Sequence, residues 1–168
     1  TTAYPSIGEH NGTLNSPASF GSGKFGNAVI LTGATGSRAT FPVAAGNLVK
    51  AFSTSLWLKW GDSANNPNYN RILENKPSSA GSSGWMIYAR NDQKNISIKG
   101  SSDNTASQQV TTDWKNGNWI HLVAAFNNGT VVCYADGSYM ALNDISPVNN
   151  STRNLILGSE RGGGSIWN

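Results

Sequence analysis

The sequence contains little charge and almost no cysteine. Asp, Glu, Lys and Arg make up 12% of its 168 residues, about half of the ~25% that is usual for a soluble globular domain. The single cysteine, Cys133, excludes an intramolecular disulfide, and one cysteine with two histidines falls short of a zinc site. No apolar run approaches the ~18 residues of a membrane-spanning helix, so we expect no membrane insertion.

The positive charge that is present is scattered along the chain. Twelve Lys and Arg against nine Asp and Glu give a formal net charge of +3, without any run of like charges. A nucleic-acid-binding domain usually gathers its lysines and arginines on one face or in one segment. The composition therefore argues against a nucleic-acid partner.

Small polar residues are correspondingly abundant, with 21 Asn, 21 Ser, 12 Thr and 19 Gly. Hydrophobic residues still reach 38% and aromatic residues 10%, too many for a disordered chain. The length fits one domain with its own core, so we interpret 1–168 as a single domain. The polar composition and the lack of disulfides favour an extracellular or secreted bacterial protein, with the surface of a virion as the alternative.

Clusters of Gly, Pro, Asn, Asp and Ser recur about every 8–12 residues, the spacing of short antiparallel strands. No window sustains an amphipathic helical period over three turns. Runs rich in β-branched and aromatic residues lie between the clusters. They predict strands at 28–31, 38–41, 52–60, 71–74, 85–90, 96–99, 108–111, 119–126, 130–135 and 154–157. The expected fold class is all-β, an antiparallel β-sandwich or jelly roll.

Alternation within two of these runs predicts which side chains face the core. In 52–60 the large apolar side chains occupy even-numbered positions, while the serines and Lys59 occupy odd-numbered ones. Trp57 is the exception, because it falls among the polar residues. In 119–126 both sides carry apolar residues, which predicts a central strand that is covered on both faces.

Two tight turns are expected beyond that central strand. Asp136-Gly137, between 130–135 and 138–142, is the strongest hairpin signal in the chain. Asn127-Asn128-Gly129 makes a similar turn just before it. Three consecutive strands over 119–142 should therefore form a meander.

Several segments, taken in order, resemble the laminin-G-like, concanavalin A-like jelly rolls of bacterial and phage extracellular proteins. They are GKFGNAVILTG (23–33), FSTSLWLKW (52–60), GWMIYAR (84–90), WIHLVAAFNNGTVVCYADGSYM (119–140) and LILGS (155–159). The resemblance covers about residues 10–168, and the stretch from Trp119 to the Tyr-Ala-Asp-Gly turn is its most specific part. It implies an antiparallel jelly roll. Family members are mostly glycan-binding, adhesion or decoration modules, and a few are glycosidases or lyases.

The chain departs from this family at both ends. It begins barely ahead of the NGTL element (11–14) and stops at Asn168, where the family continues into a closing strand. The first and last strands therefore look shortened. Exposed N–H and C=O groups at a sheet edge invite pairing with another strand. We expect a neighbouring chain, or a further part of a longer polypeptide, to complete this edge.

The residues do not predict catalysis. A glycosidase needs two carboxylates that face each other across the scissile bond, and no two of the nine acids lie within five residues of each other. A nucleophilic pair of Cys133 and His121 is conceivable on neighbouring strands. We instead interpret Cys133 as a small buried hydrophobe and His121 as a hydrogen-bonded polar residue of an apolar strand. No catalytic residue is assigned.

Calcium is left open by the resemblance. Related jelly rolls often hold calcium through an Asp near the first strand, but Tyr4-Pro5-Ser6 occupies that region here. Asp62, Asp136 and Asp144 offer carboxylate oxygens, which calcium prefers as ligands. No metal ligand is assigned, and Ca²⁺ is the one cofactor that the sequence leaves as an alternative.

A glycan site needs an aromatic platform together with polar groups that fork hydrogen bonds to hydroxyls. Trp57, Trp85 and Trp119 lie at strand positions, which predicts that they pack in the core. Tyr69 and Trp114 instead lie in polar loops, where each is either a lid on the core or an exposed platform. Asn68, beside Tyr69, is a further polar residue that could accompany it. The predicted ligand-binding residues are Tyr69, Asn70, Arg71, Asp113, Trp114 and Asn116.

The sequence therefore predicts a non-catalytic, lectin-like extracellular module whose partner is a polysaccharide or cell-surface glycan. The alternative is a structural or adhesion jelly roll of a virion, for capsid decoration or in a tail, or of a cell-surface assembly. Loops gather at the ends of the sheets in such folds, where binding commonly occurs. The sequence does not specify the sugar.

Overall fold

The computed structural model describes residues 2–3, 10–32, 36–43, 51–60, 69–76, 83–90, 95–100, 105–109, 117–144 and 151–158. Every element whose bounds it gives is a β-strand. All strand pairs among these elements are antiparallel. The predicted fold class, an all-β antiparallel sandwich, is confirmed. No helix in the described part of the chain is long and apolar enough to cross a membrane.

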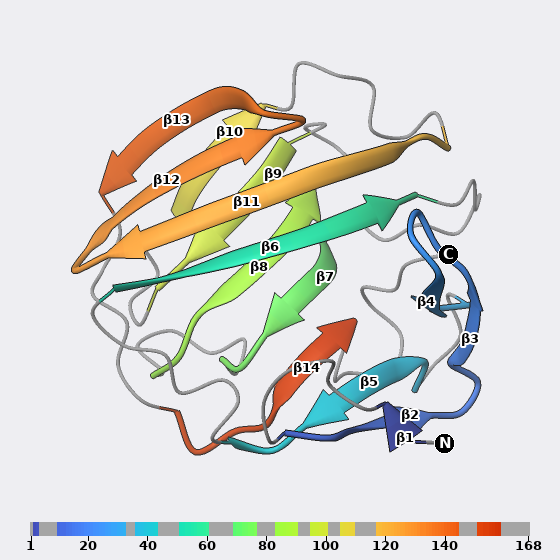
Figure 1. The fold of residues 1–168 in the computed structure, drawn as a ribbon. Coiled ribbons are helices and arrows are strands. Elements are labelled where there is room, and N and C mark those ends of the chain that lie inside the picture. The colour runs from blue at the N-terminus through green and yellow to red at the C-terminus, as the bar shows by residue number, and fades with distance from the viewer. Residues whose placement is uncertain are drawn as a thin grey trace.

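A four-stranded sheet forms the front layer in Figure 1. Its strands lie in the order β13 (Ser138–Asp144), β12 (Thr130–Ala135), β11 (Trp119–Asn127) and β6 (Ala51–Lys59). Strands β11, β12 and β13 follow one another directly, which is the predicted meander. Strand β6 joins them from far away in the sequence and pairs with β11 over its whole length.

An eight-stranded sheet lies behind the first and extends below it in Figure 1. Its order is β1 (Thr2–Ala3), β2 (Gly12–Asn15), β5 (Arg38–Phe41), β14 (Leu155–Gly158), β7 (Tyr69–Glu74), β8 (Met86–Arg90), β9 (Asn95–Lys99) and β10 (Thr105–Gln109). A separate hairpin of β3 (Ser19–Ser22) and β4 (Asn27–Ile30) lies beside the carboxyl end of β6 (Figure 1).

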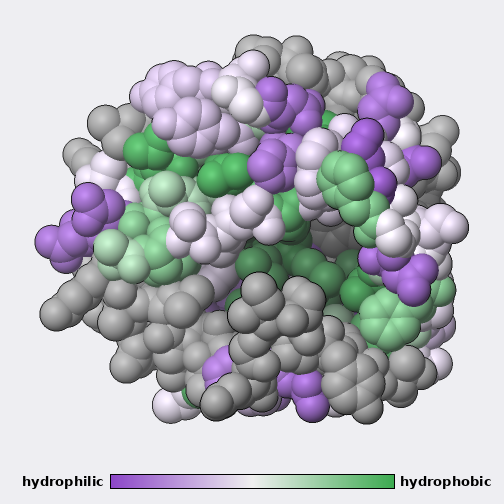
Figure 2. Space-filling view, viewed as in Figure 1, coloured by the Kyte–Doolittle hydropathy of each residue, from purple (hydrophilic) through white to green (hydrophobic). Residues whose placement is uncertain are grey.

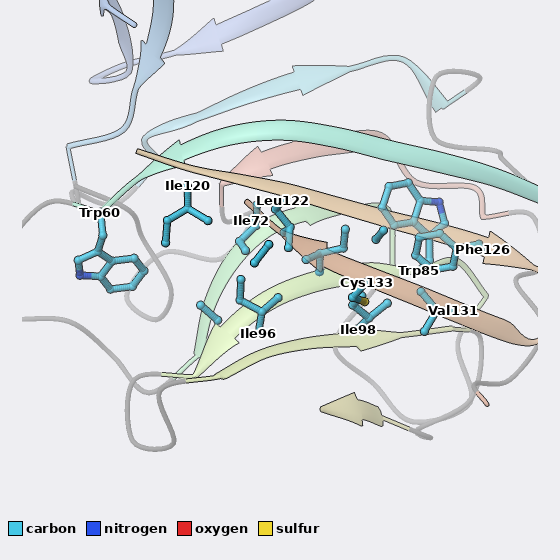
Figure 3. Close-up of a cluster of buried hydrophobic side chains, with 14 of the residues drawn as sticks. Trp60, Ile72, Trp85, Ile96, Ile98, Ile120, Leu122, Phe126, Val131 and Cys133 are labelled. Atoms are coloured by element: carbon cyan, nitrogen blue, oxygen red, sulfur yellow. The ribbon is translucent and has the colours of Figure 1, made fainter. Parts of the chain in front are cut away.

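The hydrophobic core fills the space between the two sheets. Leu122 of β11 pairs with Leu56 of β6 and has no exposed surface. Trp85, just before β8, is also fully buried, and Phe126 packs beside it (Figure 3). Phe52 stacks on Phe126 with ring centroids 4.3 Å apart. Burial of such a side chain stabilises the fold by about 1.5–3 kcal/mol, so this cluster holds the sheets together.

The central strand β11 has one buried face and one half-exposed face. Its residues alternate between half-buried and buried from Trp119 to Phe126. Its central place in the sheet agrees with the sequence prediction, but the expected cover on both faces is wrong. The half-buried residues point away from the core and form the outer face of the sheet, because successive side chains of a strand point to opposite faces.

The same alternation corrects the prediction for two tryptophans. Trp85 lies in the core as expected. Trp57 is 39% exposed, so its predicted core position is wrong. Trp119 is half-buried at an outer-face position of β11, so its predicted core position is wrong as well. An odd-numbered residue of β6 points away from the core whatever its size, because the register with β11 fixes the face.

Both predicted turns of the meander are confirmed. Asp136 and Gly137 have φ values of 49° and 77°, and Asn128 and Gly129 have values of 42° and 97°. Two-residue hairpins with positive φ at both positions match the right-handed twist of the strands. Asn, Asp and Gly adopt this conformation with little strain, so local chemistry determines both turns.

The predicted strands all overlap observed ones, with small shifts in their bounds. The run predicted at 108–111 lies instead at Thr105–Gln109. Strands β2 and β3 and the two-residue β1 were not predicted. Strand β1 pairs with β2 at one edge of the eight-stranded sheet. Residues 159–168 lie outside the described part of the chain, so the completion of the sheet edge by another segment stays a prediction.

Candidate functional site

An aromatic surface covers the outer face of the four-stranded sheet where β6 and β11 pair. Trp57 lies directly opposite His121 in the register. Their ring centroids are 4.8 Å apart, with the planes 19° from parallel. With 39% of its surface exposed, the indole presents a rigid apolar area to solvent.

The turn between β3 and β4 brings two more side chains to this indole. Phe25 approaches Trp57 edge-on, with centroids 5.6 Å apart and planes at 81°. The ammonium of Lys24 lies 5.3 Å from the centroid of the indole, which is cation–π distance. Phe25 is 72% exposed. A large apolar side chain that is exposed to solvent beside other aromatic rings is typical of a binding surface.

A cleft of about 600 Å³ opens between this hairpin and β6. Figure 2 shows it as a hollow whose floor is hydrophobic. Its described lining comes from the hairpin, from 56–59 of β6, and from Leu31, Trp60, Ile72, Trp119 and Leu157. The volume falls within the range of small-molecule sites, so the cleft can receive one or a few sugar rings.

Hydrogen bonds fix the histidine beneath the indole. His121 Nε2 and Ser55 Oγ lie 2.8 Å apart and share a hydrogen bond whose direction follows the tautomer. The backbone N–H of His121 donates to Asp136 Oδ1 at 2.8 Å, and the N–H of Asp136 donates to the His121 carbonyl at 2.9 Å. The expected hydrogen bond of His121 is thus present, on the outer face of the sheet.

A second aromatic pair lies further across the same face. Tyr134 of β12 and Tyr139 of β13 meet edge-on, with centroids 6.0 Å apart, and are 37% and 61% exposed. Val123 of β11 pairs with Tyr134 on one side and with Ser55 of β6 on the other. Adjacent strands lie about 4.8 Å apart, so the tyrosines begin about 10 Å across the sheet from β6.

The structure describes part of the site that the sequence predicts. Tyr69, Asn70 and Arg71 all lie in β7. Asn70 has no exposed surface, and the guanidinium of Arg71 forms an ion pair of 3.0 Å with Glu74. Arg71 also lies 5.7 Å from the ring centroid of Tyr88. The interactions of Arg71 that the structure describes therefore lie within its own sheet.

The other half of the predicted site falls outside the described residues, namely Asp113, Trp114 and Asn116, together with the side chain of Tyr69. Whether these residues bind a ligand stays a prediction. Sequence reasoning did not assign the surface around Trp57. The sequence did carry a signal for this surface: Trp57 occupies an odd-numbered position of its strand, with the polar residues. Alternation applied to every residue of the strand predicts that the Trp57 side chain is exposed.

The Cys133–His121 pair is excluded by geometry. Cys133 is 3% exposed and pairs with the buried Ala124 on the core face, whereas His121 lies on the outer face. Burial raises the pKa of the Cys133 thiol to about 12, so the thiol stays protonated at neutral pH. The interpretation of Cys133 as a buried hydrophobe is confirmed (Figure 3).

No group of three His, Cys, Asp or Glu that could hold a metal ion occurs among the described residues. Of the three predicted oxygen donors, Asp136 accepts the N–H of His121. The side chain of Asp144, at the end of β13, and all of Asp62 lie outside the described part. Calcium binding therefore stays an open prediction for those residues.

The concanavalin A-like lectin/glucanases superfamily matches residues 32–168. The chain belongs to this superfamily, as its sequence segments indicate. No curated protein matches the sequence at a significant level.

Solved structures share the fold at low identity. The binding domain of Paraclostridial Mosquitocidal Protein 1 has a TM-score of 0.69 and 13% identity over 94% of this chain, which spans 40% of that one. Domain 4 of AbnA, a GH43 extracellular arabinanase from Geobacillus stearothermophilus solved with arabinotriose, has a TM-score of 0.65 and 20% identity, covering 95% and 78% of the two chains. A carbohydrate esterase of Shiga toxin-encoding bacteriophage phi24B has a TM-score of 0.62 and 17% identity, covering 94% and 84%.

Proposed function

We propose that the chain is a non-catalytic, extracellular carbohydrate-binding module that holds a glycan on the outer face of β6 and β11. One observation carries the proposal: the exposed indole of Trp57 is held rigid on His121 at the mouth of a cleft. The apolar face of a sugar ring packs well on a fixed aromatic ring. Ser22 and Asn27 also line the cleft and offer hydrogen bonds to hydroxyl groups.

The second aromatic pair supports a polymeric ligand. Tyr134 lies on the same face, two strand spacings or roughly 10 Å from the strand of Trp57, and Tyr139 lies one strand further. A polysaccharide that crosses the strands would contact the indole with one sugar unit and the tyrosines with later ones. We therefore infer that the ligand is an extended chain rather than a single terminal sugar.

Two of the structural relatives favour binding over catalysis. Domain 4 of the arabinanase was solved with arabinotriose, and the mosquitocidal protein contributes a binding domain. The phage esterase points the other way. In this chain Glu74 is buried and paired with Arg71, and the described outer face presents no pair of carboxylates. The arabinanase is extracellular, in agreement with the location that we propose.

Affinity electrophoresis in gels that contain arabinan, β-glucan, pectin or alginate tests the proposal. We expect retention in at least one gel, and we expect Trp57→Ala to weaken it about tenfold or more, as for a central aromatic anchor. Retention in no gel, together with stable assembly on a larger particle, would contradict glycan binding and favour the structural alternative.

Trp114→Ala is the matched control, because it removes the tryptophan of the loop site that the sequence predicts. Binding that depends on Trp57 and tolerates Trp114→Ala supports the outer face. The reverse result would move the site to the loops and overturn the assignment made here. Circular dichroism of both variants shows whether a loss of binding reflects unfolding.

A further inference from the structure

We propose that this site selects acidic glycans, whose carboxylate or sulfate groups are held by Lys24 and Lys59. The inference rests on the proposed glycan-binding function. Lys24 lies in the β3–β4 turn, and its ammonium is 5.3 Å from the indole centroid of Trp57. Lys59 lies two residues beyond Trp57 on the same exposed face of β6. Both lysines line the cleft.

Among the described residues that line the cleft, every charged side chain is positive. Lys24 and Lys59 are its charged lining residues, and none of the others is Asp or Glu. Neither lysine forms an ion pair within the described ranges. In a chain with only 12% charged residues, two cations beside one exposed tryptophan are a local concentration of positive charge.

Among the described residues, one acid, Asp136, lies near this surface. The Asp136 carboxylate accepts the backbone N–H of His121. The carboxylate therefore lies on the β12 side of His121, whereas Trp57 lies on the β6 side. The register runs from Trp57 on β6 to His121 on β11, and Asp136 lies in the turn that follows β12. A sugar stacked on Trp57 is therefore closer to the lysine of the hairpin turn than to this carboxylate.

The position of Lys24 also favours a ligand with negative charge. A sugar ring that stacks on Trp57 displaces the ammonium from the indole and removes a cation–π contact. A neutral sugar offers no charge in return. A uronate carboxylate or a sulfate gives the displaced ammonium a charge-assisted hydrogen bond, which is stronger than one between neutral groups.

Charge selection makes a prediction that aromatic stacking does not. Attraction between exposed charges weakens as salt screens it, whereas the contact between a sugar ring and an indole does not depend on charge. Binding to an acidic polymer should therefore fall with NaCl concentration. Binding to its neutral counterpart should hardly change.

Two matched polymer pairs test the inference by titration calorimetry, at low and at high NaCl. Polygalacturonate is compared with fully methyl-esterified pectin, which keeps the backbone and loses the charge. Dextran sulfate is compared with dextran, which separates sulfate from carboxylate recognition. We expect at least one acidic polymer to bind about tenfold more tightly than its partner at low salt, and high salt to remove most of that difference.

The variant Lys24→Gln/Lys59→Gln should abolish the preference, while the neutral polymer should bind at least as tightly as before, because no cation–π contact is then displaced. Lys24→Arg/Lys59→Arg should restore it, because charge is retained. Lys99→Gln is the control: it removes a lysine near Tyr88 in the other sheet and should change nothing.

Equal affinity of the wild type for the charged and neutral members of both pairs would overturn the proposal that the site selects acidic glycans. If Trp57→Ala then lost that binding, the proposed glycan-binding function would remain intact. A preference that survives in the double Gln variant would likewise overturn the role of these lysines. Binding to no polymer of either pair or of the broader panel would contradict the glycan-binding function itself. The failures of the two proposals are thus distinguishable.

Discussion

Trp57 of β6 stacks on His121 of β11 with ring centroids 4.8 Å apart. The two residues are far apart in sequence and become neighbours only through the register of β6 with β11. The imidazole hydrogen-bonds to Ser55, and the backbone of His121 is held by Asp136. The stack therefore fixes the orientation of the exposed indole before any ligand arrives.

Trp57→Ala should reduce binding without unfolding the domain. A pair of stacked rings contributes about 0.5–1.5 kcal/mol beyond its buried area, and Trp57 lies outside the core cluster. We expect urea denaturation to show a loss in the free energy of unfolding of that size plus the contribution of the surface that the indole buries, and smaller than the loss for a core leucine. A loss comparable to that of a core leucine would mean that the indole is a structural residue.

Leu122→Ala should be strongly destabilising. Leu122 has no exposed surface and pairs with Leu56 of the neighbouring strand on the core face of the sheet, and truncation of a buried leucine costs about 2–5 kcal/mol. Val123→Ala is the matched control, because the next residue of β11 lies on the half-exposed outer face. Its cost in urea denaturation should be less than half as large; equal costs would contradict the assignment of faces.

Tyr139→Ala should weaken binding to long glycan chains and leave short ones unaffected. Tyr139 is 61% exposed and lies two strands away from β11 on the outer face. Only a chain long enough to reach from Trp57 to β13 contacts it. Calorimetry with oligosaccharides of increasing length measures this effect. A uniform loss at every length would place Tyr139 in the same subsite as Trp57.

Cys133 should make the protein less stable at alkaline pH. Burial raises the pKa of this thiol from 9.0 to about 12 in the folded chain. Between these values the unfolded chain binds fewer protons than the folded one, so the free energy of unfolding falls as pH rises. This contribution is fully present below the unfolded pKa of 9.0.

Urea denaturation of the wild type and of Cys133→Ala, at neutral pH and again above pH 9.0, isolates this effect from other titrating groups. The stability advantage of the wild type should shrink at the higher pH. An advantage that is the same at both values would show that the thiol does not remain protonated in the folded state.

Gly137→Ala should destabilise the β12–β13 hairpin through backbone strain alone. Gly137 has a φ of 77°, and an added Cβ would meet no atom within 4 Å. A left-handed conformation costs an alanine roughly 1–2 kcal/mol. Thermal unfolding should reveal a loss of that size, and Ser138→Ala in the adjoining strand should cause almost none. A neutral Gly137→Ala would show that the turn can change its type.

The sequence by itself determined the elements that depend on neighbouring residues. Runs of β-branched and aromatic residues between turn signals predicted the strands at Arg38–Phe41 and Thr130–Ala135 with their observed bounds, because such side chains favour a pleated strand. Asp136-Gly137 predicted its hairpin because those residues tolerate positive φ. The family segments then indicated how such strands combine.

Only the tertiary structure decided where the candidate site lies. The exposure of Trp57 depends on β6 pairing with β11, and the aromatic surface depends on the β3–β4 hairpin bringing Phe25 to that strand. Both are contacts between segments that local periodicity does not relate. A tryptophan has a strong tendency to be buried, which favours a core position when the sequence is considered alone. The register of the sheet overrides that tendency, because a strand cannot turn one side chain inward without turning all of them.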